Sequence, residues 1–180
     1  MTQGRMPIRP YDIVCHRKSM NHKIIKDHEE LVCTVEGLKK QGKRIVFTNG
    51  GFNLLHVGHV RSLVDARSRG DVLVVALNSD SSIKKNKGAD YPLIPEDERL
   101  ELMAALECVD LLTLFSDPTV DNLLIKLKPH VHAKGTDYTK ETVPERATVL
   151  CYGGEIAIVG DPKDHASSNI IAMIKNWQVK

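Results

Sequence analysis

Two histidines, His56 and His59, stand where an apolar segment of the chain gives way to an amphipathic one. Gly50 and Gly51 precede them and can adopt backbone angles closed to other residues, so a ligand could approach the main chain there. A helix that starts after these glycines would place both imidazoles on one face. Its first turn would offer free N–H groups and the positive end of its dipole to a phosphate. The imidazoles could donate hydrogen bonds to oxygens that gain charge during a reaction at phosphorus.

Residues 46–59 resemble the G-x-F-D-x-x-H-x-G-H signature of the cytidylyltransferase-like nucleotidyltransferases. Members of that family are α/β enzymes that join a nucleotide to a phosphorylated alcohol or sugar and release pyrophosphate. An H-x-G-H sequence alone also fits the start of an ordinary helix with two incidental histidines. Its position after a glycine pair, between a predicted strand and a predicted helix, favours the functional interpretation.

The elements that must position these residues alternate between short apolar segments and segments with helical periodicity. Buried strands are predicted at 44–48, 72–77, 111–115, 131–133 and 155–159. Helices are predicted at 27–42, up to about 69, from Pro95, from Ser116 to Pro129, near 143–151 and from Ser167. This alternation indicates an α/β, Rossmann-like, doubly wound parallel sheet of about five strands in a single domain. We expect an irregular N-terminal arm at 1–22 and a nucleotidyltransferase domain at 23–180.

Further candidate site residues directly follow predicted strands, at the sheet edge where open α/β folds bind ligands. Asn78 and Asp80 follow the second strand, and Lys134 and Asp137 follow the fourth. Residues 82–92 are predicted to form a loop with three lysines, which could clamp a triphosphate. The alternative for that segment is a solvated basic turn. Its position beside the expected phosphates favours the clamp.

From about residue 24 to residue 176 the chain is similar above all to the adenylyltransferase domain of the bacterial ADP-heptose synthases. Those enzymes make ADP-D-glycero-β-D-manno-heptose from the heptose 1-phosphate and ATP. The similarity rests on 48–50, 56–59, 78–80, 87–88, Pro92, Pro95, Arg99, 104–107, 109–110, 134–135, 137–138, 153–155 and 167–168. The chain departs from the pattern at Asn53, where the family has aspartate, and at Tyr91, Thr136 and Ser167-Ser168. The bifunctional members also carry a sugar kinase domain, for which this chain has no room, so we expect a stand-alone form.

The resemblance implies transfer of AMP from ATP to a sugar 1-phosphate, with Mg²⁺ on the nucleotide and without metal ligands from protein side chains. A sugar 1-phosphate is already anionic, so neither a general base nor a covalent intermediate is required. The residues expected to be catalytic are His56, His59, Lys87 and Arg99. Those expected to bind the nucleotide are Gly50, Gly51, Phe52, Lys84, Asp137, Ser167 and Ser168. Those expected near the acceptor are Asn53, Asn78, Asp80 and Lys134.

Two other functions stay open. A glycerol-phosphate or ethanolamine-phosphate cytidylyltransferase using CTP would share the fold and chemistry, but residues 161–168 lack the R-T-E-G-I-S-T-T sequence of those relatives. A non-catalytic nucleotide-binding relative is favoured only by Asn53. A class I aminoacyl-tRNA synthetase fragment also has an H-x-G-H turn, but this chain lacks a K-M-S-K-S loop.

The composition limits the partners. The net charge of +2, with acidic and basic residues mixed along 180 positions, gives no reason to expect nucleic acid. No apolar run approaches the roughly 20 residues that a membrane span needs. The scattered cysteines form no C-x-x-C pair, which suits a reducing cytoplasm, and those near the N-terminus match no zinc motif. We expect a cytoplasmic homodimer whose partners are ATP and a sugar phosphate.

Overall fold

The computed structural model describes residues 22–88, 90–162 and 167–177 of the chain. Nearly all of the predicted arm at 1–22 therefore lies outside the described residues, and the expectation that it is irregular stays a prediction.

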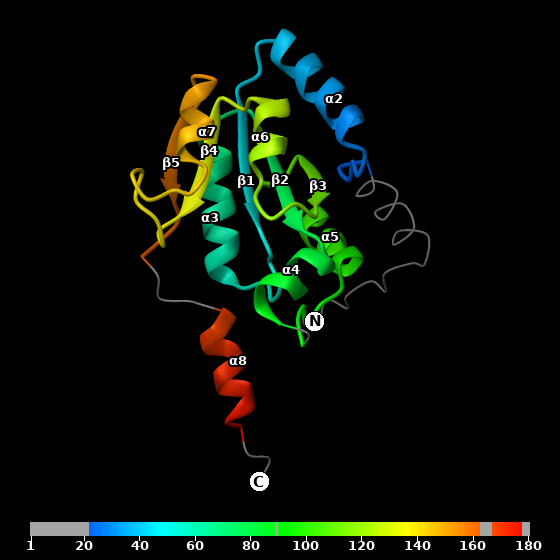
Figure 1. Ribbon diagram of the computed structural model, residues 1–180, viewed down its shortest axis with the longest axis vertical. Helices are drawn as coiled ribbons and strands as arrows, with labels where there is room; N and C mark the ends of the chain where they lie inside the picture. The colour runs from blue at the N-terminus through cyan, green and yellow to red at the C-terminus, as the bar shows by residue number, and fades with distance from the viewer. Residues whose placement is uncertain (1–21, 89, 163–166, 178–180) are drawn as a thin grey trace, which may run out of the picture.

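One parallel sheet with the strand order β3-β2-β1-β4-β5 organises the fold (Figure 1). Its strands are β1 (Ile45–Gly50), β2 (Val72–Asn78), β3 (Leu111–Phe115), β4 (Val131–Gly135) and β5 (Glu155–Val159). From β1 the chain adds strands in one direction and then returns to add β4 and β5 on the other side of β1. The order therefore reverses between β1 and β4, and such a switch point is where open α/β sheets bind ligands. The predicted fold is confirmed.

Helices cover both faces of the sheet. They are α2 (His28–Lys40), α3 (Val57–Ser68), α4 (Asp80–Lys87), α5 (Glu96–Ala104), α6 (Asp121–Leu127), α7 (Arg146–Cys151) and α8 (Ser167–Lys175). Side chains of α2, α6 and α7 form one apolar core with β1 and β2, and side chains of α3 and α5 form a second core on the other face. Phe47 belongs to the first core and Val46 to the second, because successive strand residues point to opposite faces. Burial on both faces explains why the strands are apolar throughout.

The predicted loop at 82–92 is wrong in its first half, because the lysines lie on helix α4. Ser79 caps this helix by accepting a hydrogen bond from the backbone N–H of Ser82, and Ile83 anchors it with 3% of its surface exposed. Gly88 ends the helix with a positive φ of 98°. A helix with one large apolar anchor shows little apolar periodicity, which is why the sequence pattern missed it.

The predicted start of the helix before Pro129 is also wrong. α6 begins at Asp121, with Val120 at the N-cap position. The hydroxyl of Ser116 instead donates a hydrogen bond to Ser79 Oγ at 2.9 Å, which joins the ends of β2 and β3. Ser116 therefore ties two strand ends together at the sheet edge that carries the candidate site.

Helix α8 projects from the end of the sheet, as Figure 1 shows. Ser167 at its start donates a hydrogen bond to the carbonyl oxygen of Leu54 at 3.1 Å, which links the helix to the turn after β1. Within the described ranges, no helix has both the length and the apolar character needed to cross a membrane.

Candidate active site

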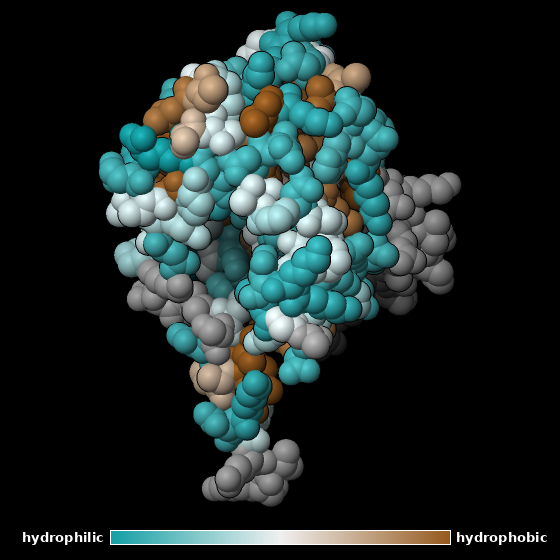
Figure 2. Space-filling view, viewed as in Figure 1, coloured by the Kyte–Doolittle hydropathy of each residue, from teal (hydrophilic) through white to brown (hydrophobic). Residues whose placement is uncertain are grey.

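A cavity of about 550 Å³ lies at the carboxyl ends of β1 and β4, at the switch point of the sheet. Its lining comes from residues within 48–52, 56–63, 134–138 and 159–162, together with Asn78, Lys87 and Ser167. Figure 2 shows the molecule hollowed on this side, with hydrophilic residues around the hollow. The cavity is thus a polar site built by segments far apart in the sequence.

His56 and His59 are stacked at the base of α3, with ring centroids 3.8 Å apart and planes inclined by 28°. His56 is the N-cap, and its Nδ1 accepts the backbone N–H of Gly58 at 3.2 Å. The Nδ1 of His59 faces back and accepts the backbone N–H of His56 at 3.4 Å. The predicted helix start therefore holds, but His56 lies one position outside the helix. A reciprocal capping pair, rather than helical spacing alone, brings the rings together.

This pairing fixes the tautomer of each neutral ring. A nitrogen that accepts a hydrogen bond carries no proton, so a neutral ring with an accepting Nδ1 has its proton on Nε2. Both histidines are therefore oriented by the backbone to act as Nε2–H donors. They line the cavity, so the donors belong to the same site.

Phe52 supports the histidine pair from the glycine turn. Its backbone has a φ of 44°, in the left-handed region that residues with a side chain seldom adopt. Its ring meets that of His59 edge-on, with centroids 5.2 Å apart. The turn after β1 thus sets the position of His59 as well as leaving room for a ligand.

The surroundings of His59 keep its ring neutral near pH 7. Burial lowers the pKa of His59 to about 4, and repulsion from Lys87 and from the protonated form of His56 adds to this effect. A neutral imidazole whose Nδ1 accepts the backbone N–H still donates from Nε2. This protonation state suits a hydrogen-bond donor to a phosphate oxygen.

Lys134 at the end of β4 supplies a cation to the cavity lining. Its Nζ donates hydrogen bonds to Asn49 Oδ1 and to Glu145 Oε1, both at 3.2 Å, and lies 5.2 Å from the centre of the Tyr138 ring. Only 8% of the residue is exposed. Lys134 is therefore held by partners from β1 and from the segment before α7.

The segment after β5 is fastened to α3 and forms another wall of the cavity. Asp65 accepts the backbone N–H of Gly160 at 2.9 Å, and Arg61 pairs with Asp161 at 2.8 Å. Thr136 donates its hydroxyl to the carbonyl oxygen of Asp161 at 2.9 Å, which joins this wall to the end of β4. These contacts set where the chain leaves β5 on its way to α8.

Most of the residues predicted from the sequence lie together around this cavity. The lining includes His56, His59, Lys87, Gly50, Gly51, Phe52, Asn78, Lys134, Asp137 and Ser167. Lys84, Arg99, Asn53 and Asp80 are not part of the lining. The side chain of Ser168 lies outside the described part of the chain, although the residue belongs to α8.

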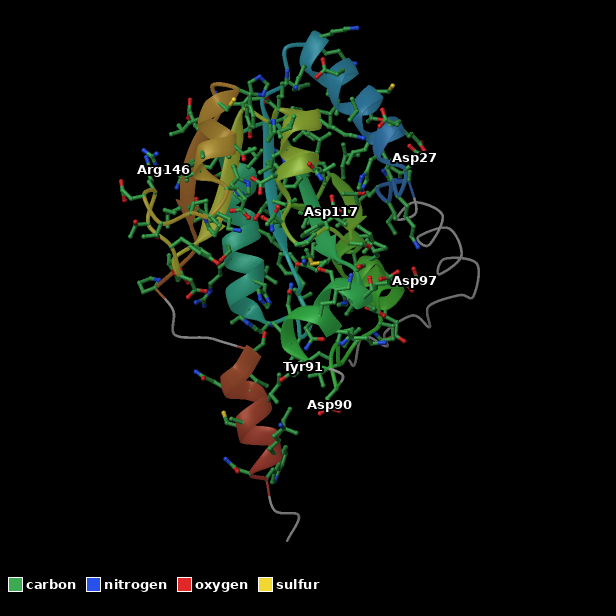
Figure 3. All side chains as sticks on the ribbon, in the orientation of Figure 1. Asp27, Asp90, Tyr91, Asp97, Asp117 and Arg146 are labelled. Atoms are coloured by element: carbon green, nitrogen blue, oxygen red, sulfur yellow. The ribbon has the colours of Figure 1, made fainter. Side chains whose placement is uncertain are left out.

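Lys87 and Lys84 differ in their relation to the cavity, although a spacing of three on α4 places them on the same side of that helix. Lys87 lines the cavity, and its Nζ lies 6.0 Å from the centre of the Tyr91 ring. Figure 3 shows Tyr91 beside α4, at the end of the molecule where α8 starts. Lys84 is exposed one turn earlier on the helix. The predicted lysine clamp is thus represented in the cavity by Lys87 alone among the lysines of α4.

Arg99 lies behind the glycine turn, with only 1% of the residue exposed. Its guanidinium donates to the carbonyl oxygens of Gly51 at 2.6 Å, Asn78 at 2.9 Å and Ile94 at 3.0 Å. It also pairs with Asp80 at 2.7 Å. This ion pair supports the backbone of the glycine turn, and neither residue lines the cavity, so their direct contact with substrate stays a prediction that the structure does not support.

Asn53 is buried next to the same turn. Its Oδ1 accepts the backbone N–H of Leu93 at 2.6 Å, and 5% of the residue is exposed. The predicted contact between Asn53 and the acceptor does not fit this geometry. Asn53 instead ties the turn after β1 to the segment that precedes α5.

The sequence pattern missed Glu145, Arg61 and the hydrogen-bonding role of Asn49. Glu145 is 6% exposed and contacts both Lys134 and His132. No clear signal in the sequence marks Glu145, which lies between Pro144 and Arg146 and resembles an ordinary exposed glutamate there. Only the fold shows which cation it faces.

The described residues contain no group of three or more His, Cys, Asp or Glu side chains that could hold a metal ion. The cavity lining includes two carboxylates, Asp137 and Asp161, and Asp161 is paired with Arg61. A divalent cation in such a site would have to bring most of its ligands with it, as Mg²⁺ on nucleotide phosphates does.

Comparison with known proteins adds the family context. The family model for cytidylyltransferase-like proteins matches residues 47–173. Bifunctional protein HldE of Pelobacter propionicus is 47% identical over 150 residues, which is 83% of this chain and 31% of that protein. Bifunctional protein HldE of Geotalea uraniireducens is 42% identical over 180 residues, covering 98% of this chain and 37% of that protein. The chain thus spans about a third of the length of these curated relatives.

Solved structures share the fold. The lipopolysaccharide core biosynthesis protein from Thermoplasma volcanium superimposes with a TM-score of 0.59 at 27% identity, over 68% of this chain and 100% of that one. Pantoate-beta-alanine ligase from Francisella tularensis, crystallised with an ATP form and beta-alanine, gives a TM-score of 0.58 at 19% identity over 84% of this chain and 76% of that one. At 19% identity the second likeness concerns the fold alone.

Proposed function

The chain belongs to the cytidylyltransferase-like family, and we propose that it transfers AMP from ATP to a sugar 1-phosphate with release of pyrophosphate. The proposed acceptor is D-glycero-β-D-manno-heptose 1-phosphate, which would give ADP-heptose. The resemblance to the adenylyltransferase domain of ADP-heptose synthases supports this choice. So does the similarity to the two HldE proteins over most of this chain.

The observation that carries the proposal is the stacked pair of histidines, each of which uses its Nδ1 to accept a backbone N–H. Two Nε2–H donors beside a helix N-terminus match the needs of a phosphate chain that gains negative charge. Donors held in place before the reaction need no reorganisation during it, and each is worth on the order of 10²–10³ in rate.

In the proposed reaction, the phosphate oxygen of the sugar attacks the α-phosphorus of ATP, and the bond to the β-phosphate oxygen breaks. The attacking oxygen is already ionised near neutral pH, so the protein does not need to remove a proton. His56 and His59 would donate to the oxygens around the α- and β-phosphorus, and Lys87 would face the departing pyrophosphate. The main tasks of the protein are therefore alignment and charge stabilisation.

The lining residues outside the histidine pair suit the acceptor and the rest of the nucleotide. Lys134 would bind the sugar phosphate, while Asp137 and Ser167 on the lining would help hold the nucleotide. Mg²⁺ is proposed to enter with ATP and, when bound, to neutralise part of the phosphate charge. The scarcity of cavity carboxylates supports a cation carried by the substrate.

Pyrophosphate release across a panel of sugar 1-phosphates with ATP and Mg²⁺ tests the proposal. We expect the highest kcat/KM with D-glycero-β-D-manno-heptose 1-phosphate. A variant with both His56 and His59 replaced by alanine is the control. It should release no more pyrophosphate than the same mixture without protein.

The same assay separates the alternatives. Turnover with CTP and glycerol 3-phosphate or ethanolamine phosphate, but not with ATP and a sugar phosphate, would assign the chain to the cytidylyltransferases. Tight nucleotide binding without any turnover would favour a non-catalytic relative. The described geometry gives the second alternative no particular support, because Asn53 makes a hydrogen bond that needs no charge.

A further inference from the structure

Glu145 is a buried carboxylate that does not line the cavity but contacts a residue that does. Its Oε1 accepts from Lys134 Nζ at 3.2 Å, and its Oε2 lies 3.5 Å from His132 Nε2. His132 is fully buried and stacks on Phe47 with centroids 5.8 Å apart. Glu145 thus sits between a cation that faces the cavity and a histidine inside the core.

The charges of this cluster can be assigned. Burial alone would raise the pKa of the Glu145 carboxyl, but its contact with His132 and the charge of Lys134 outweigh burial and hold the pKa at about 2. Burial lowers the pKa of His132, so the imidazole is neutral and adds no charge. Glu145 is therefore ionised near pH 7, and Lys134 is its cationic partner.

Glu145 also limits how Lys134 can move. A lysine side chain has several rotatable bonds, and ordering it costs about 2 kcal/mol of rotamer entropy. An ammonium has three N–H donors. Glu145 and Asn49 accept two of them from different sides, which leaves one for a ligand in the cavity that Lys134 lines. The two acceptors fix both the reach of the side chain and the direction of that remaining donor.

We propose that Glu145 is a positioning residue that holds the Lys134 ammonium against the cavity, where it meets the phosphate of the acceptor. The inference rests on the proposed sugar-phosphate acceptor and extends it to a residue outside the site. Glu145 itself would touch no substrate. Its contribution to catalysis should therefore disappear when Lys134 is absent.

A double-mutant cycle with Glu145→Gln and Lys134→Met tests this dependence. Glutamine has the size of glutamate but no charge, so the fold should be kept. We expect Glu145→Gln to lower kcat/KM for the sugar phosphate by about 10- to 100-fold, as a misplaced binding group does, with KM for ATP changed less than about threefold. In the Lys134→Met background the same change should have almost no further effect. Additive losses in the two variants, or equal losses for both substrates, would overturn the proposal.

A second measurement needs no turnover. The ammonium protons of a held, buried lysine exchange slowly enough for a ¹H–¹⁵N NMR cross-peak, which Lys134→Met would assign. We expect that peak in the wild type and in Glu155→Gln, and its loss in Glu145→Gln. Glu155 is a suitable control because it is an exposed glutamate that pairs with Arg44 at the start of β5. A peak that persists in Glu145→Gln would contradict the positioning role. If the wild type gave the peak but no turnover with any sugar phosphate, the proposed function would fail separately.

Discussion

The imidazoles of His56 and His59 lie 3.8 Å apart, and each accepts a backbone N–H through Nδ1, His56 from Gly58 and His59 from His56. Two positively charged rings at this distance would repel each other strongly. Burial is the main cause of the lowered pKa of His59, to about 4, and this repulsion adds to it. The pair therefore behaves as a set of oriented donors, which makes the role of each histidine separately testable.

Replacing His59 with alanine should lower kcat by about 10²–10³-fold, because one oriented donor to the developing charge is lost. The effect on folding should be small, about 1 kcal/mol or less in the free energy of unfolding, since the capping contact to His56 is long at 3.4 Å. Steady-state kinetics and urea unfolding measure the two quantities on the same sample.

His28 provides the matched control for this variant. His28 is the first residue of α2, and none of that helix lines the cavity. Its Nε2 lies 2.8 Å from the carbonyl oxygen of Leu114. His28→Ala should cost a similar amount of stability and leave kcat unchanged. A His59 variant with full turnover, or one that is largely unfolded, would contradict the assignment of His59 as a donor.

The lowered pKa of His59 also predicts how stability depends on pH. Between about pH 4 and pH 6.5 the unfolded chain protonates this histidine while the native chain does not, so stability should fall as the pH falls through that range. The partly exposed ring limits the effect to about 1 kcal/mol between pH 7.5 and pH 5. His59→Gln should flatten the curve by that amount in thermal or urea unfolding. Burial also lowers the pKa of His130 and of His132, but both remain in each protein, so their contributions cancel in the comparison. If the free energy of unfolding depended on pH equally in the wild type and in His59→Gln, the pKa of His59 would not be lowered in the native protein.

Arg99 should matter more for folding than for phosphate binding. Arg99→Met removes the donor to the carbonyl oxygens of Gly51, Asn78 and Ile94 and leaves Asp80 without its partner. We expect the free energy of unfolding to fall by about 3 kcal/mol or more. Arg99→Lys keeps the charge but cannot span these acceptors, so it should recover only part of the loss. Unchanged unfolding with a large loss of kcat would instead support the direct phosphate contact expected from the sequence.

The sequence was sufficient to predict the elements and their common edge, because apolar periodicity is a local property. The five strands and the helix start at His56 follow from residues within a few positions of one another. The site residues that follow β1 and β4 met in one cavity because parallel strands align their carboxyl ends. The H-x-G-H pattern lies at a helix start and also directly after β1, so the local pattern and the position at the sheet edge both pointed to the stacked pair.

The contacts that the sequence did not reveal have a shared physical cause. In each, the hydrogen-bond partner is distant in the sequence or is a backbone group that any residue type supplies. Arg99 binds backbone carbonyl oxygens, and any residue type can supply these. Asn53 bonds a backbone N–H forty positions away. Glu145 reaches Lys134 only after the chain turns between β4 and α7. α4 was missed because its stability depends on the cap at Ser79 and on one buried isoleucine rather than on a repeated pattern.

The choice of nucleotide is testable by direct comparison. At equal concentrations of ATP and CTP, with the heptose 1-phosphate as acceptor, we expect kcat/KM to favour ATP by at least about tenfold, or roughly 1.4 kcal/mol. The expectation follows from the resemblance to the adenylyltransferase domains over residues 87–110. A preference for CTP would move the protein to the cytidylyltransferase branch, while leaving the assignment of the histidines intact.

Asn53 offers the sharpest test of what this position requires. Its Oδ1 accepts the N–H of Leu93 at 2.6 Å, and a carboxylate oxygen could accept the same hydrogen bond. If residue 53 serves to accept the Leu93 N–H, asparagine and aspartate can both do so. Asn53→Asp should then change kcat by less than about tenfold in either direction. Asn53→Leu has a similar volume but no acceptor, and it should lower the free energy of unfolding by about 1 kcal/mol because the hydrogen bond to the Leu93 N–H is lost. Kinetics with ATP, Mg²⁺ and the sugar phosphate, combined with urea unfolding of all three proteins, separates the hydrogen bond from the charge. A wild type without activity that gains it on Asn53→Asp would show that the charge is required, and that the native chain is a non-catalytic relative.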